Sequence, residues 1–443
     1  MTTQTTNLPK IIILDDDPTG SQTVHSCLLL MRWDVETLRL ALSDEIPLFF
    51  ILTNTRAVTP EKAKEITTEV CQNLKIALAA EEIADFLVIS RSDSTLRGHY
   101  PIETDVIEQE LGSFDAHFLT PAFFEGGRVT IDSVHYLLIN GVRTPVHETE
   151  FARDSVFGYS HSYLPDYVAE KTKGRIPAEA VVRFTLEDIR QGVRSRLVDL
   201  VDNRCVVVDG ETQADFDLLA KDILATVAIG KRFLFRSAAS LITSLAQLGS
   251  QPTSPEAMAN YKPTQQPGVF IVGSHVRKTT QQLLRLLQES GVTGIEVDVT
   301  RLRDFPAQSN DLLREIIQSV HQAFTRGQTP VVYTSRQELS FVNIQQRLDF
   351  GKTVSGLLMD VVRGLPPEIG FLVSKGGITS NDVLSDGLNL TTARLLGQII
   401  PGCSMVITPE DHPSFPKLPV VLFPGNVGEV DSLVTVGHCL RNS

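Results

Sequence analysis

The sequence predicts an α/β protein with two domains, each built on a mostly parallel sheet flanked by helices. Short aliphatic runs alternate with amphipathic helical segments from residue 11 onward, which is typical of repeated strand and helix units. Several runs end in polar or glycine-bearing turns, and parallel α/β sheets bind their ligands at that end of the strands. Because 443 residues exceed one ordinary domain, two or three domains are expected, and the alternation of strands and helices favours two. We expect the ligand cleft to lie between these two domains.

The composition is that of an acidic globular protein. Hydrophobic residues make up 42% of the chain and charged residues 21%. The 53 acidic and 40 basic residues give a net charge of −13, which argues against a nucleic-acid partner. The sequence shows neither a signal-peptide apolar region nor a stretch long enough to cross a bilayer, so we expect a cytoplasmic protein with no membrane partner.

The first predicted strand carries an unusual acidic end. Residues 11–14 are all aliphatic, which suits a strand buried on both faces, and three aspartates follow at 15–17. Adjacent carboxylates repel one another unless a cation, a metal or a hydroxylated ligand compensates them. The alternative is a solvated acidic turn closed by Pro18 and Gly20.

Two further predicted strands also run into polar residues. Residues 48–52 precede a turn that contains Arg56, and a helix with Pro60 at its first position follows. Residues 86–89 precede the polar stretch 90–98. If these strands are parallel neighbours of the first, their polar groups converge on one edge of the sheet.

The remainder of the first half contributes more strands and one arginine turn. Residues 117–119 and 206–208 are strand candidates, and the turn after the first of them contains Arg128. Residues 140–180 lack a clear period and predict an irregular excursion. A stretch at 246–267, rich in proline, glutamine, serine and threonine, predicts a linker between a domain at 1–245 and another at 268–443.

The second half contains three apolar runs that each end in a glycine-bearing turn. Residues 269–272, 371–373 and 420–423 precede these turns. Turn residues of this kind let backbone amides approach an anion closely, and a helix that starts there adds a favourable dipole. The candidate anion-binding residues of these turns are Ser274, Gly376, Gly377, Thr379, Gly425, Asn426 and Gly428. A side chain at Gly377 is expected to block this approach and to force an unfavourable φ.

Other known motifs do not fit. Residues 351–353 resemble the end of a P-loop, but Gln346 occupies the position of its first glycine. No G-x-G-x-x-G motif follows a predicted strand, which argues against a nicotinamide dehydrogenase.

Four motifs, in the same order along the chain, resemble those of the four-carbon acid sugar kinases. They are D-D-x-T-G at 16–20, D-S-T-L-R-G at 93–98, G-S-x-x-x-x-T-x-x-Q at 273–282 and G-G-x-T at 376–379. The resemblance implies an N-terminal domain that binds an acid sugar and a C-terminal domain that binds ATP. It implies Mg²⁺-dependent phosphorylation of a hydroxyl on threonate, erythronate or 3-oxo-tetronate, and it leaves open whether the chain forms a homo-oligomer.

The resemblance also implies residue roles. It assigns nucleotide binding to Ser274, Gly376, Gly377, Thr379 and Gly425, to which Asn426 and Gly428 of the last turn are added. The substrate-binding candidates, to which Arg128 is added for its place in a polar turn, are Asp17, Arg56, Arg91, Asp93, Ser94, Arg97 and Arg128. Arginine suits the substrate carboxylate and carboxylates suit its hydroxyls. The catalytic candidates are Asp16, Asp17 and Asp93, of which Asp16 or Asp17 would orient the attacking hydroxyl and accept its proton.

The chain departs from the family pattern at three places. Asp15 adds a carboxylate where a small residue is common, and Arg91 stands where lysine is common. Residues 424–428 replace a more usual K-x-G-x-x-G, which leaves Lys375 or a group of backbone amides to meet the phosphate charge. Besides a kinase, two classes therefore stay open: a sugar-acid enzyme of aldolase or epimerase type without ATP, and a regulator that binds an acid sugar or a nucleotide.

Overall fold

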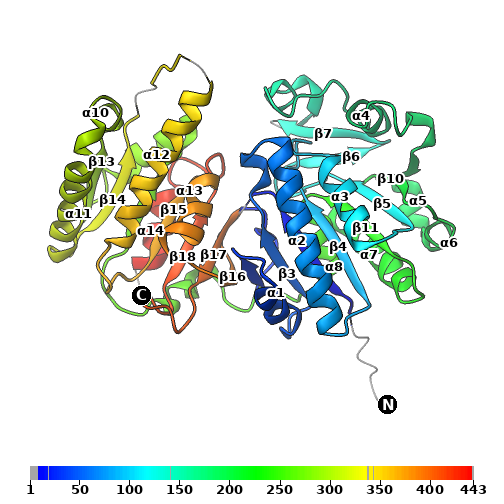
Figure 1. The fold of residues 1–443 in the computed structure, drawn as a ribbon, viewed down its shortest axis with the longest axis horizontal. Coiled ribbons are helices and arrows are strands. Elements are labelled where there is room, and N and C mark those ends of the chain that lie inside the picture. The colour runs from blue at the N-terminus through cyan, green and yellow to red at the C-terminus, as the bar shows by residue number, and fades with distance from the viewer. Residues whose placement is uncertain (1–7, 18, 140, 337–338, 343, 442–443) are drawn as a thin grey trace. The chain divides into compact units, whose positions relative to one another are not determined.

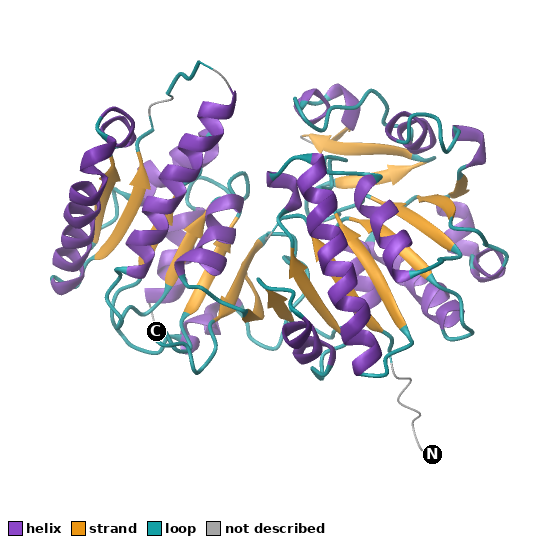
Figure 2. Cartoon of the chain, in the orientation of Figure 1, coloured by secondary structure: helices purple, strands orange, loops and turns teal. Residues whose placement is uncertain are grey.

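The computed structural model describes residues 8–17, 19–139, 141–336, 339–342 and 344–441, so Pro18 of the predicted acidic turn lies outside the described residues. The architecture is mixed α/β with largely parallel strands, and the predicted fold class is confirmed (Figures 1 and 2). The chain divides into two compact units, residues 1–250 and 251–443, and each is described by itself.

The first unit is built on a sheet in which every paired neighbour is parallel. Its strand order is β2 (Leu28–Leu30), β3 (Leu48–Leu52), β1 (Lys10–Asp15), β4 (Phe86–Arg91), β11 (Phe233–Ser237), β5 (Ala116–Thr120), β10 (Arg204–Val208) and β9 (Val182–Phe184). Ile11, Ile12 and Ile13 are fully buried in the middle of this sheet, as the aliphatic run predicts. The carboxyl ends of β3, β1 and β4 therefore lie together at one edge.

Helices of the first unit cover this sheet (Figure 1). They are α1 (Val35–Leu42), α2 (Pro60–Ala80), α3 (Ile102–Leu111), α4 (Leu164–Lys171), α5 (Leu186–Gln191), α6 (Arg194–Val198), α7 (Gln213–Val227) and α8 (Ala239–Ala246). The apolar faces of α1, α2 and α3 form one core with Ile12, Phe49 and Val88 of the sheet. Thr59 accepts a hydrogen bond from the Lys62 amide and Pro60 opens α2, so this helix begins where the sequence predicts.

The predicted irregular stretch 140–180 begins with the last strand of a small sheet, whose first two strands precede it, and continues with short helices. A separate antiparallel sheet consists of β6 (Arg128–Ile131), β7 (Val134–Ile139) and β8 (Val142–Pro145). Three short 3₁₀ helices and α4 follow it: η2 (Val146–Glu148), η3 (Glu150–Arg153) and η4 (Ala178–Ala180). The period-2 signal of these strands is weak because several of their residues are only half-buried.

The second unit has a sheet of five parallel strands followed by two antiparallel ones. The order is β13 (Val292–Val297), β14 (Thr329–Thr334), β12 (Val269–Val272), β15 (Leu372–Lys375), β18 (Pro419–Phe423), β17 (Cys403–Ile407) and β16 (Thr392–Ile400). The carboxyl ends of β14, β12, β15 and β18 therefore share one edge, and the turns with candidate nucleotide-binding residues lie there.

The helices of the second unit follow or precede these strands along the chain. They are α9 (Arg277–Leu286), α10 (Val299–Asp304), α11 (Ser309–Thr325), α12 (Ile344–Arg363), α13 (Gly377–Asp382), continued by a π-helical turn at Val383–Gly387, and α14 (Ser432–Arg441). The P-loop-like residues 351–353 lie inside α12. Among the residues that the structure describes, no helix combines the length and the apolar character needed to span a membrane.

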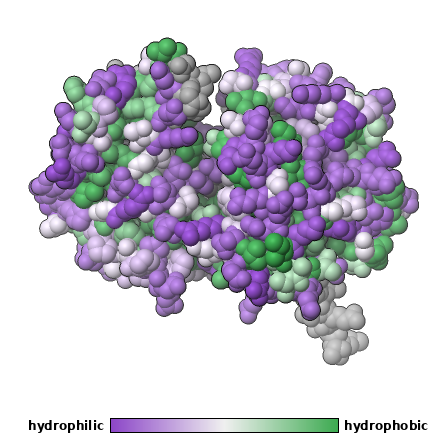
Figure 3. Space-filling model, viewed as in Figure 1, coloured by the Kyte–Doolittle hydropathy of each residue, from purple (hydrophilic) through white to green (hydrophobic). Residues whose placement is uncertain are grey.

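Most of the predicted linker is structured. Residues Pro255–Tyr261 form the 3₁₀ helix η5, and Met258 is fully buried in the core of the second unit with Phe270 and Leu433. The side-chain amide of Gln251 donates to the carbonyl of Gln398 at 3.1 Å. From residue 251 onward this stretch therefore packs as part of the second unit. On the face drawn in Figure 3, hydrophilic residues cover most of the surface and apolar residues are scattered.

Candidate functional site

The acid-rich edge of the first unit is assembled by three neighbouring strand ends. Asp15 is in register with Leu52 of β3 on one side and with Arg91 of β4 on the other. The residues after these positions therefore emerge side by side, and the 3₁₀ helix η1 (Thr55–Ala57) presents Arg56. The backbone amide of Arg56 donates to the carbonyl of Asp16 at 3.3 Å, which holds this short helix against the acidic turn.

Arg56 lies at the centre of three of the predicted acids. Its guanidinium makes two hydrogen bonds to Asp16, at 2.5 and 3.2 Å, and one to Asp17 at 3.2 Å. One oxygen of Asp93 lies 3.8 Å from the same guanidinium. The structure thus brings together Asp16, Asp17, Arg56 and Asp93, and their catalytic and substrate roles stay predictions.

The three acids differ in exposure and in charge state. The Asp16 side chain is 1% exposed, whereas that of Asp17 is 23% and that of Asp93 is 13% exposed. Burial raises the pKa of Asp16 although Arg56 and Arg91 oppose the shift. Burial acts in the same direction on Asp17 and Asp93, but there the arginines outweigh it and the pKa of each carboxyl is lowered. Asp17 and Asp93 are therefore ionised and accessible at neutral pH.

Asp15 and Arg91 form a buried pair beneath this cluster. The Nη1 atom of Arg91 lies 3.3 Å from Asp15 and 3.4 Å from Asp16. A side chain at Gly20 would place its Cβ 2.3 Å from Asp15 Oδ2 and 2.5 Å from Arg91 Nε, so only glycine fits over the pair. Because the Arg91 side chain is only 8% exposed, it faces the acids and is shielded from solvent.

The buried Asp15 predicts an unusual pH dependence of stability. Burial raises the pKa of Asp15 from 3.8 to about 7 against the opposing charge of Arg91. The folded state then holds this proton more tightly than the unfolded state, so stability is lost as the pH rises from about 4 to about 7. We expect Asp15→Asn to reduce the fall in unfolding temperature between pH 5 and pH 8 by several degrees. Thermal unfolding of both proteins at the two pH values measures this, and an equal fall in both would refute it.

The loop that contains Asp93 and Ser94 is held by side chains distant in sequence. His135 Nε2 donates to the carbonyl of Ser94 at 2.8 Å, and the Tyr159 and Tyr167 hydroxyls donate to the next two carbonyls at 2.8 and 2.9 Å. Burial lowers the pKa of His135 to about 4, so the ring is neutral and its Nδ1 accepts from Thr130. These three side chains fix the loop, and the sequence did not reveal them.

Two arginines lie beside Asp93. Arg97 Nε donates to Asp93 at 2.8 Å, and its guanidinium stacks 4.9 Å above the ring of Phe151. Arg128 donates to the carbonyl of Gly126, while its Nε is shielded from solvent without a hydrogen-bond partner among the described residues. Burial lowers the pKa of Arg128, and the neighbouring Asp93 opposes this. Arg97 and Arg128 are thus two cations placed next to the acids.

A further arginine at this edge was not predicted. Arg236, on β11, is 2% exposed and donates from Nη1 to Ser90 and to Glu103, both at 2.6 Å. A Cβ at Gly98, where φ is +129°, would lie 2.4 Å from Arg236 Nη2 and 3.1 Å from Asp16 Oδ2. Arg236 therefore supports Asp16 from below. The available signal was a charged residue that ends the buried apolar run 233–235.

The carboxylates do not by themselves form a metal site. Among the described residues there is no group of three or more histidine, cysteine, aspartate or glutamate side chains arranged to hold a metal ion. Arg56 and Arg91 instead occupy the positions between the acids.

The nucleotide candidates converge at the edge of the second unit. Ser274 donates from its amide to the Lys375 carbonyl at 3.2 Å, which joins the ends of β12 and β15. Thr279 Oγ1 contacts the Ser274 hydroxyl at 3.1 Å and the Gly425 carbonyl at 2.8 Å. Gly376 donates to the carbonyl of Phe423 at 2.8 Å. These contacts bring the three predicted turns together.

The glycines at this edge pack so closely against Ser274 that a side chain at either would clash with it. A Cβ at Gly425 would lie 2.9 Å from the Ser274 hydroxyl, and one at Gly376 would lie 3.0 Å from Ser274 Cβ. Gly376 has a φ of +125° and Gly428 a φ of +82°, whereas Gly377 is the first residue of α13. The prediction that a side chain at Gly377 would force an unfavourable φ is therefore wrong. The glycine with a positive φ is Gly376, one residue earlier, because the chain turns before the helix begins.

The remaining nucleotide candidates differ in exposure. Thr379 is buried, whereas Asn426 is exposed. Lys375 is fully buried, and its Nζ donates to the carbonyls of Pro424 at 2.5 Å and Gly425 at 3.2 Å. Nζ also lies 4.0 Å from the centre of the Phe423 ring, and burial lowers the lysine pKa to about 7. The Lys375 amine therefore holds the 424–425 turn, and of the two predicted alternatives the backbone amides are the better placed to meet phosphate.

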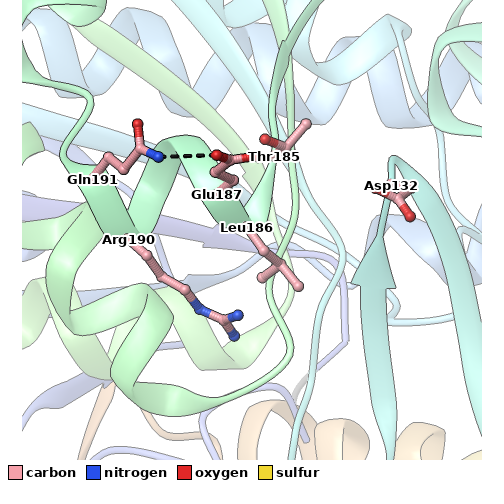
Figure 4. A pocket seen from close by; sticks show the side chains of 6 residues that line it. All are labelled: Asp132, Thr185, Leu186, Glu187, Arg190 and Gln191. Atoms are coloured by element: carbon pink, nitrogen blue, oxygen red, sulfur yellow. Dashed lines mark hydrogen bonds between the residues drawn. The ribbon is translucent and has the colours of Figure 1, made fainter.

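A separate surface cavity of about 550 Å³ lies away from these residues (Figure 4). Asp132 of the β6–β7 turn faces residues 185–191 across it, and Gln191 donates to Glu187 at 3.0 Å. None of the predicted site residues lines this cavity.

Comparisons with known proteins agree with this division of the chain. A family model for a sugar-binding N-terminal domain matches residues 11–245, and one for a nucleotide-binding C-terminal domain matches residues 269–433. A D-erythronate kinase from Heliobacterium modesticaldum is 28% identical over 316 residues, which are 67% of this chain. The chain spans 64% of the length of that relative.

Solved structures show the same fold at low sequence identity. A Salmonella typhimurium LT2 protein with a provisional tRNA synthase name aligns with a TM-score of 0.70 at 18% identity, over 96% of this chain and 98% of its own. A Haemophilus influenzae protein from a family of unknown function aligns with a TM-score of 0.64 at 16% identity. The alignment covers 97% of this chain and 100% of that protein. The two domain models, which together match more than half of the chain, show that it belongs to the four-carbon acid sugar kinase family.

Proposed function

We propose that the protein transfers the terminal phosphate of ATP to a hydroxyl of a four-carbon acid sugar of the threonate, erythronate or 3-oxo-tetronate type. The observation that carries the proposal is the cluster of Asp17, Arg56 and Asp93 at the strand ends of a sugar-binding domain. The same chain holds a glycine-lined edge in a nucleotide-binding domain. The D-erythronate kinase relative supports the choice of substrate class.

The proposed substrate contacts follow from charge. A small polyhydroxy acid has one carboxylate, which suits the paired cations Arg97 and Arg128. Its hydroxyl groups donate to the ionised and accessible carboxylates Asp17 and Asp93. Because Asp16 is almost fully enclosed by arginines, Asp17 is the better candidate to orient the attacking hydroxyl.

The proposed ATP contacts rest on the glycine edge. Gly376 and Gly425 let their turns pack against Ser274 without a clash, and we expect phosphate oxygens to bind the backbone amides at the start of α13. Mg²⁺ would neutralise phosphate charge when bound. Since Arg56 and Arg91 already fill the gaps between the described acids, we expect phosphate oxygens and water to supply most magnesium ligands.

The test is an ADP-release assay with a panel of four-carbon acids, together with calorimetry of ATP-analogue and acid binding. ADP release that depends on one of the acids supports the kinase. Acid binding without nucleotide binding favours a sugar-acid enzyme of another type. Binding of either ligand with no turnover across the panel favours the regulator.

Arg97 provides a test of the carboxylate contact. Arg97→Lys keeps the positive charge but loses the planar fork that pairs with a carboxylate and stacks on Phe151. We expect KM for the acid sugar to rise about tenfold while kcat changes less than threefold. The exposed Arg194→Lys serves as the matched control in the same unit. Steady-state kinetics decide it, and a loss confined to kcat would contradict the assignment.

A further inference from the structure

We propose that Arg336 is the side chain that binds the phosphate chain of the nucleotide. The inference rests on the proposed ATP-dependent function and names a residue that neither the motifs nor the comparisons assign. Arg336 follows β14 by two residues, and β14 is the parallel neighbour of β12. It therefore reaches the same strand edge as Ser274.

A direct contact fixes the position of the guanidinium. Arg336 Nη2 donates to the carbonyl of Ser274 at 2.6 Å. Ser274 also contacts Thr279, and a Cβ at either Gly376 or Gly425 would touch its side chain. The guanidinium is thus tied to the turn around which the three glycine-bearing strand ends meet.

The rest of the guanidinium is shielded but unsatisfied. Nε and Nη1 of Arg336 have almost no solvent contact and no hydrogen-bond partner among the described residues. Shielded cationic N–H groups without an acceptor are costly, and an arginine fork matches the oxygens of a phosphate group. An anion at this edge would supply the missing acceptors.

Other cations near this edge are less suited to the role. Lys375 is committed to two backbone carbonyls. Arg277 and Lys278 begin α9 but are exposed, and like charges at a helix start oppose the helix dipole unless an anion binds there. Their presence adds positive potential around the position that Arg336 occupies.

The experiment measures nucleotide affinity of the full-length protein. A nonhydrolysable ATP analogue is titrated by calorimetry into wild type, Arg336→Gln, Arg336→Lys and the control Arg314→Gln, an exposed arginine of α11. Adenosine affinity is measured by displacement of a fluorescent ATP analogue. We expect Arg336→Gln to lower the affinity for the ATP analogue at least tenfold and the affinity for adenosine less than twofold. Arg336→Lys should have an ATP-analogue affinity between those of wild type and Arg336→Gln, and the control should match wild type.

Each result decides a different point. An ATP-analogue affinity within threefold of wild type in Arg336→Gln would overturn the assignment. An equal loss for adenosine and the ATP analogue would also overturn it, because Arg336 would then only support the Ser274 turn. Unchanged thermal unfolding and acid-sugar binding show that the variant is folded. If wild type itself binds no nucleotide, the proposed function fails before the Arg336 variants are compared.

Discussion

Asp17→Asn is expected to lower turnover about a hundredfold or more while ATP binding persists. Asp17 Oδ1 accepts two hydrogen bonds from Thr19, at 2.9 and 2.6 Å, which orients the carboxylate. Oδ2 accepts one bond from Arg56 at 3.2 Å and keeps lone-pair capacity for a substrate hydroxyl. The asparagine has the same size, but it loses the charge and one acceptor, so the attacking hydroxyl is no longer held or deprotonated.

The pH profile gives a second measurement of this role. Burial would raise the pKa of Asp17, but Arg56 and Arg91 outweigh it and lower the value below 3.8. The carboxylate therefore stays charged as the pH falls, and the acid limb of kcat/KM should lie below about pH 4 if it belongs to Asp17.

Three further aspartate variants identify which carboxylate accepts the proton of the substrate hydroxyl. Asp199→Asn, at an exposed position of the same unit, is the control for the change of residue type. Asp16→Asn and Asp93→Asn test the other two acids. Normal turnover in Asp17→Asn would move the proton acceptor to one of these, and loss of ATP-analogue binding would mean that the substitution disturbs more than the sugar site.

The convergence of the first site was predictable because it depends on local patterns. Each buried run ends at its own polar residue, and parallel pairing alone brings Asp17, Arg56 and Asp93 to one edge. The support beneath them was not predictable. Arg236 contacts Glu103 across 133 positions of sequence and His135 contacts Ser94 across 41, and no local period encodes such pairs.

The second unit shows a different limit of sequence patterns. The composition of residues 246–267 fits a free linker as well as a 3₁₀ segment that packs on a core. Only the burial of Met258, which the structure shows, distinguishes the two. A lysine beside a glycine turn likewise suggests phosphate binding. The amine of such a lysine can face outward or donate to a neighbouring turn. Lys375 does the latter because β18 pairs with β15 and brings the carbonyl of Pro424 within reach of its amine.

Gly376→Ala is expected to weaken binding of an ATP analogue at least tenfold, about 1.4 kcal/mol, while acid-sugar binding is retained. Gly376 adopts φ +125° and ψ 142°, which residues with a Cβ rarely adopt, so the alanine shifts the backbone just before α13. Its Cβ would also lie 3.0 Å from Ser274 Cβ, which is closer than carbon atoms normally approach, so the Ser274 turn would have to shift. The backbone strain and the added atom both act on the amides that would meet the anion.

Gly327→Ala separates strain at the edge from strain elsewhere in the second unit. Gly327 has a φ of +70°, and its Cβ would have no atom within 4 Å, so this variant strains the backbone without filling space at the edge. Calorimetry with the ATP analogue and, separately, with the acid sugar compares the two variants. Equal nucleotide affinity in both would show that the edge at Gly376 does not contact the phosphates. A loss only in Gly376→Ala, with unfolding temperatures lowered alike, would assign the effect to the edge at Gly376 and not to a general loss of stability, because Gly327→Ala carries a backbone cost away from that edge.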